Sequence, residues 1–477
     1  MFTLKKTIIL SLGIALFISC QKQLNKSEEK VIEIAAINSE MLETAVIYEA
    51  NIRQYSNEGS FNAFTKDIPQ LKELGVKVIW LMPVFPISQT KRKATGGDFA
   101  SLIKDETLRK KALGSYYAVS DYRTINPEFG TIEDFRELVK TAHDNGIYII
   151  LDWVPNHTGW DHPWLKTNPE FYKKNSKGEI TDPLNDDGTS KGWGDVAQLD
   201  MSNNALQEAM IIDMQYWVEK ENVDGFRCDH VDPTPISFWE KAIPTLQKNK
   251  KLFMLAETGD PKFMKDGLFD MCYAWDTHFM MNDIVKGKKS VKDWDDLMTK
   301  LSLDLDTNDY LMNFVTSHDE NSWKGTVTER FGDASETMLA LSYMTPGMPL
   351  IYSGQEYGLN HRLKFFEKDL IPKTKGKVWN DLKKLGKLKN NYVALNGGVN
   401  AADYIRIETG NKNILMFSRS KNDEKILFVS NLSDVEQKLN AIPSGTYVNY
   451  MSNKEEHYKE LQVETLAPWE YKILEKK

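Results

Sequence analysis

The sequence predicts a (β/α)8 barrel (TIM barrel) with a small excursion after its third strand and a C-terminal antiparallel β domain. Three observations lead to this fold class: apolar runs alternate with helical patterns, the runs number eight, and shorter alternating runs replace them beyond residue 395. Continuous apolar strands separated by amphipathic helices are typical of a parallel sheet that helices cover. Eight such units over this length favour a closed barrel over an open sheet.

The predicted barrel occupies residues 44–395, and its strands are short and almost wholly apolar. They lie at residues 44–50, 76–82, 147–152, 223–229, 252–257, 268–273, 310–316 and 348–352. Helical spacing is clearest at residues 64–74, 135–144 and 206–221. No glycine-rich phosphate fingerprint follows the first strand, which argues against a dinucleotide-binding fold.

One predicted connection is unusually long. The segment from about residue 155 to residue 200 is rich in Asn, Asp, Gly, Pro and Trp and shows no clear helical or strand periodicity. Long loops within compact domains are usually functional, so we expect an excursion over the mouth of the barrel. Beyond the barrel, residues 396–477 show short runs of alternating polarity separated by turn residues. This pattern predicts a separate antiparallel β domain.

The N-terminal segment indicates export. Lys5 and Lys6 precede an apolar run over residues 7–18, which is too short to cross a bilayer and predicts a signal peptide at residues 1–19. Cys20 follows a small residue, as in the cleavage site of bacterial lipoproteins, and residues 20–43 then form a lipid-anchored tether. We therefore expect a cell-envelope protein, an outer-membrane lipoprotein on the cell surface or the periplasmic face. The alternative is an ordinary cleaved signal with an incidental cysteine.

Composition excludes some partners. The 477 residues are 41% hydrophobic and 27% charged, with a formal net charge of −8. That balance and the lack of a basic patch give no reason to expect nucleic acid. Membrane association rests on the lipid anchor only. Cys228 and Cys272 lie in apolar segments and are expected to be free, buried thiols.

Acidic residues directly follow several predicted strands. They are Asp152, Asp229, Glu257 and Asp319. The carboxyl ends of all barrel strands meet on one face, so these acids should converge there. Basic residues of the same segments, expected beside them, are His157, Arg227 and His318. A single acid at a strand end could equally cap a helix or lie on the surface, but four together favour a shared site.

Converging carboxylates suit the cleavage of a glycosidic bond. One carboxylate stays ionised as the nucleophile, and another stays protonated to deliver a proton to the leaving oxygen. Arg227 precedes Asp229 by two residues, so both side chains point to one side of the strand, where the guanidinium favours an ionised Asp229. Burial and neighbouring acids should raise the pKa of Glu257, as a general acid requires.

Four of these segments resemble, in the same order, the motifs of the α-amylase family, glycoside hydrolase family 13. They are residues 152–157, 225–230, the strand that ends at Glu257, and residues 314–319, with a weaker match at Gln198-Leu199-Asp200. The resemblance covers about residue 44 to the end of the chain. It implies that Asp229 is the nucleophile, Glu257 the acid/base, and Asp319 the acid that grips sugar hydroxyls and aids distortion.

The same resemblance implies the substrate-binding residues. Arg227 orients Asp229, His157 and His318 bind the sugar at the cleavage point, and Tyr117 stacks beneath that sugar. Asp152 organises the neighbourhood of Arg227 and Tyr117, and core packing is the alternative role of Tyr117. The excursion also carries three tryptophans, one of which we expect to be a sugar platform: Trp160, Trp164 or Trp193.

Calcium is the cofactor that the resemblance suggests, through oxygen ligands matching Asn156 and Asp200. Plain hydrogen bonding by these two residues is the alternative. The segment His230-Val231-Asp232-Pro233 departs from family members that carry Lys-His there. This departure puts in doubt one calcium ligand and the usual contacts to the sugar on the leaving side.

The function that these observations predict is endo-acting hydrolysis of α-1,4 bonds in starch-like glucans. The substrate is then an α-glucan polysaccharide or oligosaccharide, and other glycan-uptake proteins of the envelope are possible neighbours. Neopullulanase or cyclomaltodextrinase activity and exo-acting α-glucosidase activity share every catalytic residue and stay open. An alternative of another class is a non-catalytic glycan-binding surface lipoprotein, since fold alone does not fix function.

Overall fold

The computed structural model describes residues 36–185, 187–306 and 308–477. The predicted signal peptide, Cys20 and most of the predicted tether lie outside these ranges. Within them, no helix combines the length and the apolar character that a bilayer span needs. Cys228 and Cys272 are free and buried, as predicted.

Eight parallel strands close into a barrel, and the predicted fold class is therefore confirmed. The first strand pairs with both its successor and the last strand: Ile47 lies opposite Val78 on one side and opposite Leu350 on the other. The barrel strands are β1 Val46–Ala50, β2 Val76–Leu81, β3 Tyr148–Trp153, β6 Gly225–Cys228, β7 Phe253–Ala256, β8 Met271–Tyr273, β9 Tyr310–Asn313 and β10 Met348–Tyr352.

Alternate strand residues face opposite sides of the barrel wall. One set, which includes Ile47, Ile150 and Leu255, packs into a core inside the barrel. The other set, which includes Ile149 and Phe226, packs outward against the helices. The strands read as continuous apolar runs because both faces are buried. This alternation fixes which polar side chains at the strand ends point toward the barrel axis.

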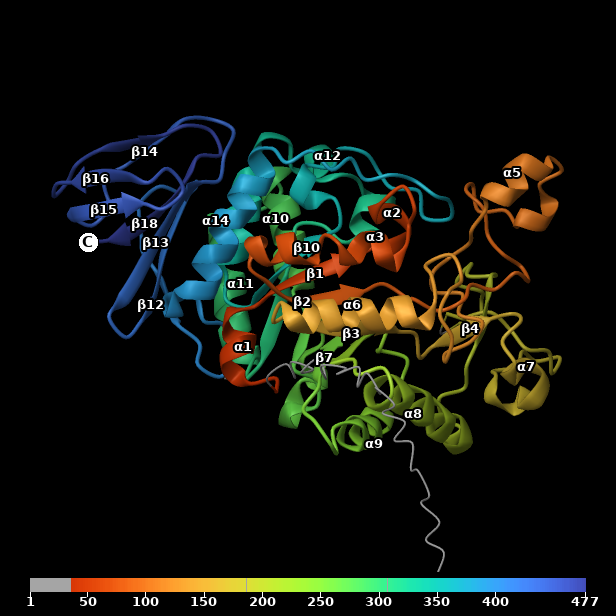
Figure 1. Ribbon diagram of the computed structural model, residues 1–477. Coiled ribbons are helices and arrows are strands. Elements are labelled where there is room, and N and C mark those ends of the chain that lie inside the picture. Colours follow the sequence, from red (N-terminus) through yellow and green to blue (C-terminus); the bar gives the residue numbers. More distant parts are fainter. Residues whose placement is uncertain (1–35, 186, 307) are drawn as a thin grey trace, which may run out of the picture. The chain divides into compact units, whose positions relative to one another are not determined.

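Helices cover the outside of the barrel (Figure 1). Helix α6 shows why they form: Thr131 caps its first turn in a reciprocal bond with Asp134, and its buried residues share one face. The larger helices are α6 Ile132–Asp144, α8 Asn204–Glu219, α9 Ile236–Leu246, α10 Trp275–Val285, α11 Val291–Asp304, α13 Ser335–Met344 and α14 Lys377–Asn391. Shorter ones are α2 Ile52–Tyr55, α3 Phe61–Thr65, α4 Ile68–Leu71 and α12 Val327–Phe331.

A short helix precedes the first strand, within residues assigned from sequence to the tether. Asn38 caps α1 (Ser39–Thr44), and the buried side chains of Met41 and Leu42 join the core inside the barrel. Because α1 leads directly into the N-terminal end of β1, it lies at the barrel face opposite the strand ends that carry the acids. The C-terminal end of the predicted tether is thus folded against the barrel.

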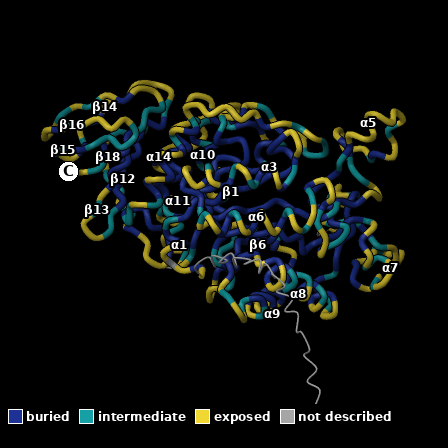
Figure 2. The backbone as a smooth tube through the Cα atoms, viewed as in Figure 1, coloured by how far each residue is buried: buried dark blue, intermediate teal, exposed yellow. Residues whose placement is uncertain are grey.

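Long connections gather above the carboxyl ends of the strands. The predicted excursion contains the two-stranded antiparallel ribbon of β4 His157–Gly159 and β5 Val196–Gln198, with helix α7 Trp164–Thr167 between them. A second long connection, between β2 and α6, carries α5 Glu106–Lys111 and was not predicted. Figure 2 shows α5 exposed, in contrast to the buried barrel strands.

The C-terminal segment forms the predicted antiparallel β structure. Its main sheet has six strands in the order β11-β12-β13-β18-β15-β16, beside a two-stranded sheet of β14 and β17. Contacts with the barrel include a hydrogen bond from Trp294 Nε1 to Tyr404 Oη, 3.2 Å long. The strands are β11 Asp403–Arg406, β12 Ile414–Lys421, β13 Glu424–Asn431, β14 Gln437–Leu439, β15 Gly445–Asn449, β16 Lys454–Tyr458, β17 Glu464–Leu466 and β18 Tyr471–Lys476.

Candidate active site

The strand alternation turns the key polar side chains inward. Leu255 packs inside the barrel, so Glu257, two residues on, follows it toward the axis. Phe226 and Cys228 pack outward, which leaves Arg227 facing inward between them. Gly225 begins this strand at φ +154°, and an added Cβ would lie 1.9 Å from the carbonyl oxygen of Phe253. Only glycine therefore allows β6 to approach β7 closely enough to present Arg227 beside Glu257.

A single buried guanidinium holds three carboxylates together. Arg227 Nη1 lies 2.8 Å from Asp152 Oδ1 and 2.8 Å from Asp229 Oδ1. Its Nη2 lies 2.6 Å from Glu257 Oε1, and its Nε donates to Tyr273 Oη at 3.0 Å. Asp229 and Glu257 are therefore neighbours across one guanidinium, as retaining glycosidases require of their two acids.

Burial sets the protonation of these acids. It is the largest cause that raises the pKa of Glu257 to about 7, with Asp229 and Asp319 adding to the effect and Arg227 opposing it. Burial likewise raises the pKa of Asp229 to about 6 despite the opposing pull of Arg227. The predicted rise for Glu257 thus occurs. For Asp229, Arg227 lowers the pKa, as predicted, but burial raises it by more.

Tyr117 and His318 form a second layer beside Asp152. Tyr117 Oη donates to Asp152 Oδ2 at 3.1 Å and lies 2.9 Å from His318 Nε2, with the two rings stacked. His318 Nδ1 lies 2.5 Å from Glu49 Oε1. Although burial opposes it, the carboxylates of Asp319 and Glu49 raise the pKa of His318 to about 9. The imidazolium therefore donates from both ring nitrogens, to Glu49 and to Tyr117.

Asp319 is the most accessible of the predicted acids, with 43% of its side chain exposed. Its Oδ2 lies 3.6 Å from His318 Nε2. A short π-helix follows directly, at Glu320–Lys324, and it presents Trp323 to solvent. Single-turn π segments are frequent at functional sites. Asp319 thus lies at the edge of the cluster, where an incoming ligand can reach it.

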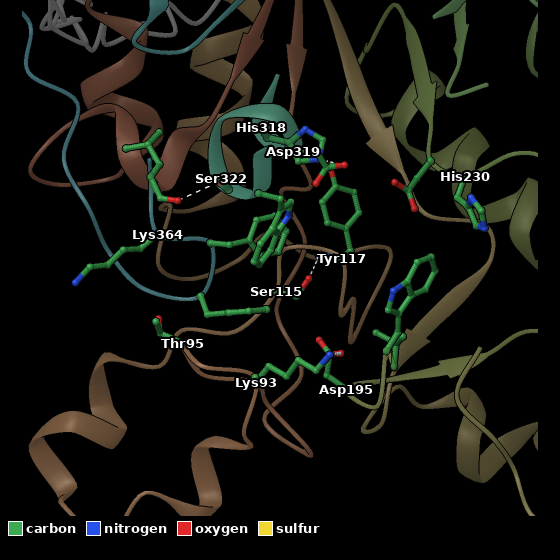
Figure 3. A pocket seen from close by; sticks show the side chains of 18 of the residues that line it. Lys93, Thr95, Ser115, Tyr117, Asp195, His230, His318, Asp319, Ser322 and Lys364 are labelled. Atoms are coloured by element: carbon green, nitrogen blue, oxygen red, sulfur yellow. Dashed lines mark hydrogen bonds and ion pairs between the residues drawn. The ribbon is translucent and has the colours of Figure 1, made fainter. Parts of the chain in front are cut away.

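These side chains open into one pocket of about 910 Å3 (Figure 3). Asp229, Glu257, Asp319, Tyr117, His157 and His318 all line it, so it gathers most of the predicted site residues. Asp152 and Arg227 lie beneath it, fully buried. Figure 3 shows His230 on one side of Tyr117 and Asp319, and Lys364 on the other. The pocket therefore extends to both sides of the acid cluster.

Aromatic side chains lie at both sides of this pocket. Trp193 meets His157 edge-on at a ring distance of 5.9 Å, and Trp323 packs on Phe365 at 5.1 Å. Trp193 is the excursion tryptophan that lines the pocket. Trp160 instead lies beneath Lys91, and Trp164 packs on His162.

Sequence reasoning missed several residues of the site. Glu49, Trp80 and Tyr273 also face into the barrel, and Trp80 Nε1 donates to Asp152 Oδ2 at 3.0 Å. The signal was available for Glu49, since a charged residue at the end of an apolar strand requires a partner. The loop residues Lys364, Phe365 and Phe366 had no comparable signal, because no periodicity places a loop.

The proposed calcium donors lie in adjacent segments. Leu199 N donates to Asn156 O at 3.0 Å, which brings Asp200, the next residue, close to Asn156 in space. Asp200 Oδ1 already accepts from Ser202 Oγ at 2.7 Å, and Asn156 Nδ2 lies 3.2 Å from His157 Nδ1. Oxygen donors suit Ca²⁺, but two are few for an ion that takes six to eight. In the described ranges, no three His, Cys, Asp or Glu side chains form a metal-binding group.

A barrel whose strand ends gather paired carboxylates, one with a raised pKa, in an aromatic pocket defines a glycoside hydrolase. The comparisons with known proteins agree. The family model for the α-amylase catalytic domain matches residues 27–181 and 191–392. The chain therefore belongs to the α-amylase family and is an α-amylase-type glycoside hydrolase.

Individual relatives resemble most of the chain. Alpha-amylase 3 of Dictyoglomus thermophilum is 26% identical over 85% of this chain and 88% of its own length. A maltogenic alpha-amylase structure from Thermotoga neapolitana matches with a TM-score of 0.78 and 27% identity, covering 91% of this chain and 99% of that one. An alpha-amylase from Lactobacillus plantarum gives a TM-score of 0.77 at 26% identity over 91% of this chain and 99% of that one.

Relatives with transfer activity are also present. An α-1,4-glucan:maltose-1-phosphate maltosyltransferase of Myxococcus xanthus is 28% identical over 51% of this chain, which spans 37% of that protein. A 4-alpha-glucanotransferase of Thermotoga neapolitana is 28% identical over 66% of this chain and 71% of its own length. These comparisons establish the family and the glycosidase class of this chain. They do not select one reaction among those of its relatives.

Proposed function

We propose that this protein is an endo-acting α-amylase that hydrolyses α-1,4 bonds of starch-like glucans with retention of anomeric configuration. The observation that supports it is the pairing of Asp229 and Glu257 on Arg227, at a pocket that both acids line. Exposed aromatic side chains lie at both sides, Trp193 at 36% and Trp323 at 50% exposure. Sugar rings bound on both sides of the acids would place an internal linkage at the reaction centre.

In the first step, the Asp229 carboxylate attacks the anomeric carbon while Glu257 donates its proton to the glycosidic oxygen. The bond between that carbon and oxygen breaks, and the leaving sugar departs with the proton as a free hydroxyl group. Arg227 keeps Asp229 oriented, since one guanidinium nitrogen binds both Asp229 and the fully buried Asp152. Asp319, the most accessible of the acids, then binds hydroxyls of the sugar that remains.

In the second step, Glu257, now ionised, accepts a proton from water, and the resulting nucleophile attacks the same carbon. The bond to Asp229 breaks, so both carboxyl groups return to their starting states. Two inversions at one carbon give net retention. The pKa of Glu257 of about 7 suits this exchange of roles, since acid and base forms are both accessible near neutral pH.

The pH dependence of kcat/KM follows from the two acids. The nucleophile must be ionised, so the rate should rise through the pKa of Asp229, about 6. The general acid must be protonated, so the rate should fall above the pKa of Glu257, about 7. A bell-shaped profile with its maximum between these values is expected when maltopentaose hydrolysis is followed from pH 4 to 9. A rate that keeps rising to pH 9 would exclude Glu257 as the acid.

The products distinguish endo action from its alternatives. With soluble starch, we expect iodine colour to fall early, when few reducing ends have formed, because internal cleavage shortens chains fastest. Slow loss of colour with immediate release of glucose would instead identify an exo-acting α-glucosidase. Faster attack on pullulan or cyclodextrin than on starch would favour the neopullulanase or cyclomaltodextrinase alternative. If the protein binds glucan but releases no product, the remaining hypothesis is a non-catalytic glycan-binding surface lipoprotein.

Two further proposals concern location and calcium. We propose that the protein is an outer-membrane lipoprotein anchored through Cys20; labelled palmitate should enter the wild-type protein and not Cys20→Ala. In support, the basic flank and the short apolar run over residues 7–18 lead directly to Ser19-Cys20. Calcium at Asn156 and Asp200 stays a prediction, which a rise in Tm on adding Ca²⁺ after chelation would support.

A further inference from the structure

The residue after Asp229 has an unusual backbone. His230 adopts φ +42°, in the left-handed region that non-glycine residues rarely occupy. In this conformation, its backbone N donates to Glu257 Oε2 at 2.7 Å. Its ring lines the pocket, on the right of Figure 3. The strained residue thus joins the acid/base Glu257 to one side of the pocket.

Two residues of the excursion meet this imidazole. Lys191 Nζ lies 3.3 Å from His230 Nε2 and 5.3 Å from the ring centre of Trp193. Trp193 meets His230 edge-on at a ring distance of 5.5 Å. No carboxylate of the described residues forms an ion pair with Lys191. Its ammonium group therefore keeps donors for a ligand, and we call these three residues the Lys191 cluster.

The electrostatics make this cluster a hydroxyl-binding one. Burial, and then the charge of Lys191, lower the pKa of His230, so the imidazole stays neutral near pH 7. An ammonium group only donates, so the neutral imidazole accepts from Lys191 at Nε2 and carries its own proton on Nδ1. The ring therefore offers one donor to a ligand, and the ammonium group keeps further donors. The partly exposed indole of Trp193 adds an apolar surface. These donors and the aromatic face together fit a pyranose ring.

The position of the cluster identifies the sugar. Glu257 protonates the glycosidic oxygen, so the sugar that leaves with that oxygen must lie against Glu257. His230 donates a backbone hydrogen bond to Glu257. Tyr117 and His318 contact each other and lie beside Asp319 instead. In the segment after Asp229, Asp232 is engaged with Thr258 Oγ1 at 2.9 Å, and no lysine is present. The nearby cationic donor is therefore supplied by the excursion.

We propose that Lys191, Trp193 and His230 form the subsite for the leaving sugar, and that they determine how well this enzyme uses sugar leaving groups and sugar acceptors. The inference rests on the proposed hydrolytic function and specifies which residues recognise the leaving side. By microscopic reversibility, a sugar acceptor that attacks the glycosyl-enzyme binds at the same place as a sugar that leaves.

The test compares two substrates that differ on the leaving side. Maltopentaose places sugar there, whereas α-maltosyl fluoride loses only fluoride. In Lys191→Met and His230→Ala, the ratio of kcat/KM for maltopentaose to kcat/KM for the fluoride should fall about tenfold, the effect of roughly one hydrogen bond to substrate. A ratio cancels any difference in the folded fraction. Lys177→Met, an exposed lysine of the same excursion, is the matched control and should keep the wild-type ratio.

A second measurement uses acceptors directly. With α-maltosyl fluoride as donor and maltose as acceptor, both variants should form less transfer product per hydrolysis event than the wild type. An unchanged ratio in both experiments would overturn the proposal. If the ratio is unchanged because both kcat/KM values fall equally, the cluster has a general role in supporting Glu257 and does not recognise the leaving sugar. If the wild-type protein cleaves neither substrate, the proposed hydrolytic function itself fails.

Discussion

Asp229→Asn and Glu257→Gln should each lower kcat for maltopentaose at least ~10³-fold while leaving the fold intact. Both substitutions keep the size of the side chain and its contact with Arg227, so far-ultraviolet circular dichroism and Tm should change little. Asn cannot displace a sugar from its anomeric carbon, and Gln has no acidic proton to deliver. Glu240→Gln, an exposed glutamate on α9, is the matched control and should retain wild-type kcat.

The two variants should also differ from each other. Fluoride leaves without strong help from an acid, so Glu257→Gln should lose much less activity on α-maltosyl fluoride than on maltopentaose. Asp229→Asn should lose activity on both, because every substrate needs the nucleophile. Equal losses of Glu257→Gln on the two substrates would contradict its role as the acid, and wild-type turnover by Asp229→Asn would remove the nucleophile assignment.

Arg227→Met should be the most damaging substitution for stability. Met fills much of the same space but leaves Asp152, Asp229 and Glu257 without the cation that they share. Removing one partner of a buried ion pair costs about 3–5 kcal/mol. We expect a loss of that order in the free energy of unfolding, measured by urea denaturation at pH 7. Arg109→Met, on the exposed α5, is the control and should change it little.

The pH dependence of that loss has a definite sign. The folded-state pKa of Asp152 and that of Asp229 are each already about 6 with Arg227 present, above the values for an unfolded chain. Without the guanidinium they should rise further, so the folded state binds more protons than the unfolded state. Stability then falls as pH rises through this range. The variant should be least impaired near pH 5 and most impaired at pH 8; the opposite trend would contradict the shared-cation account.

Apolar periodicity was sufficient to predict the barrel and the meeting of its strand ends. Asp152, Arg227, Asp229 and Glu257 follow because side-chain direction in a strand depends only on local alternation. The same rule applied to β1 would have found Glu49, whose carboxylate accepts a hydrogen bond from Nδ1 of His318. It was missed because the strand reads as wholly apolar until its penultimate residue.

Other parts of the site were beyond sequence reasoning. The loop residues Phe365 and Lys364 reach the pocket through irregular backbone, which no periodic signal encodes. The contact of Lys191 with His230 joins residues that are 39 positions apart, across the excursion. The net pKa of Asp229 depends on a balance of burial against the charge of Arg227, and the extent of burial appears only in three dimensions.

The stereochemistry of the first product tests the central claim most directly. When maltopentaose is cleaved in an NMR tube, the anomeric proton of the newly formed reducing end reports its configuration before mutarotation. If Asp229 attacks and Glu257 delivers the proton, the α-anomer must accumulate first and the β-anomer must follow only at the rate of spontaneous mutarotation. Initial accumulation of the β-anomer would show a single displacement by water, and the paired roles of these carboxylates would then be wrong.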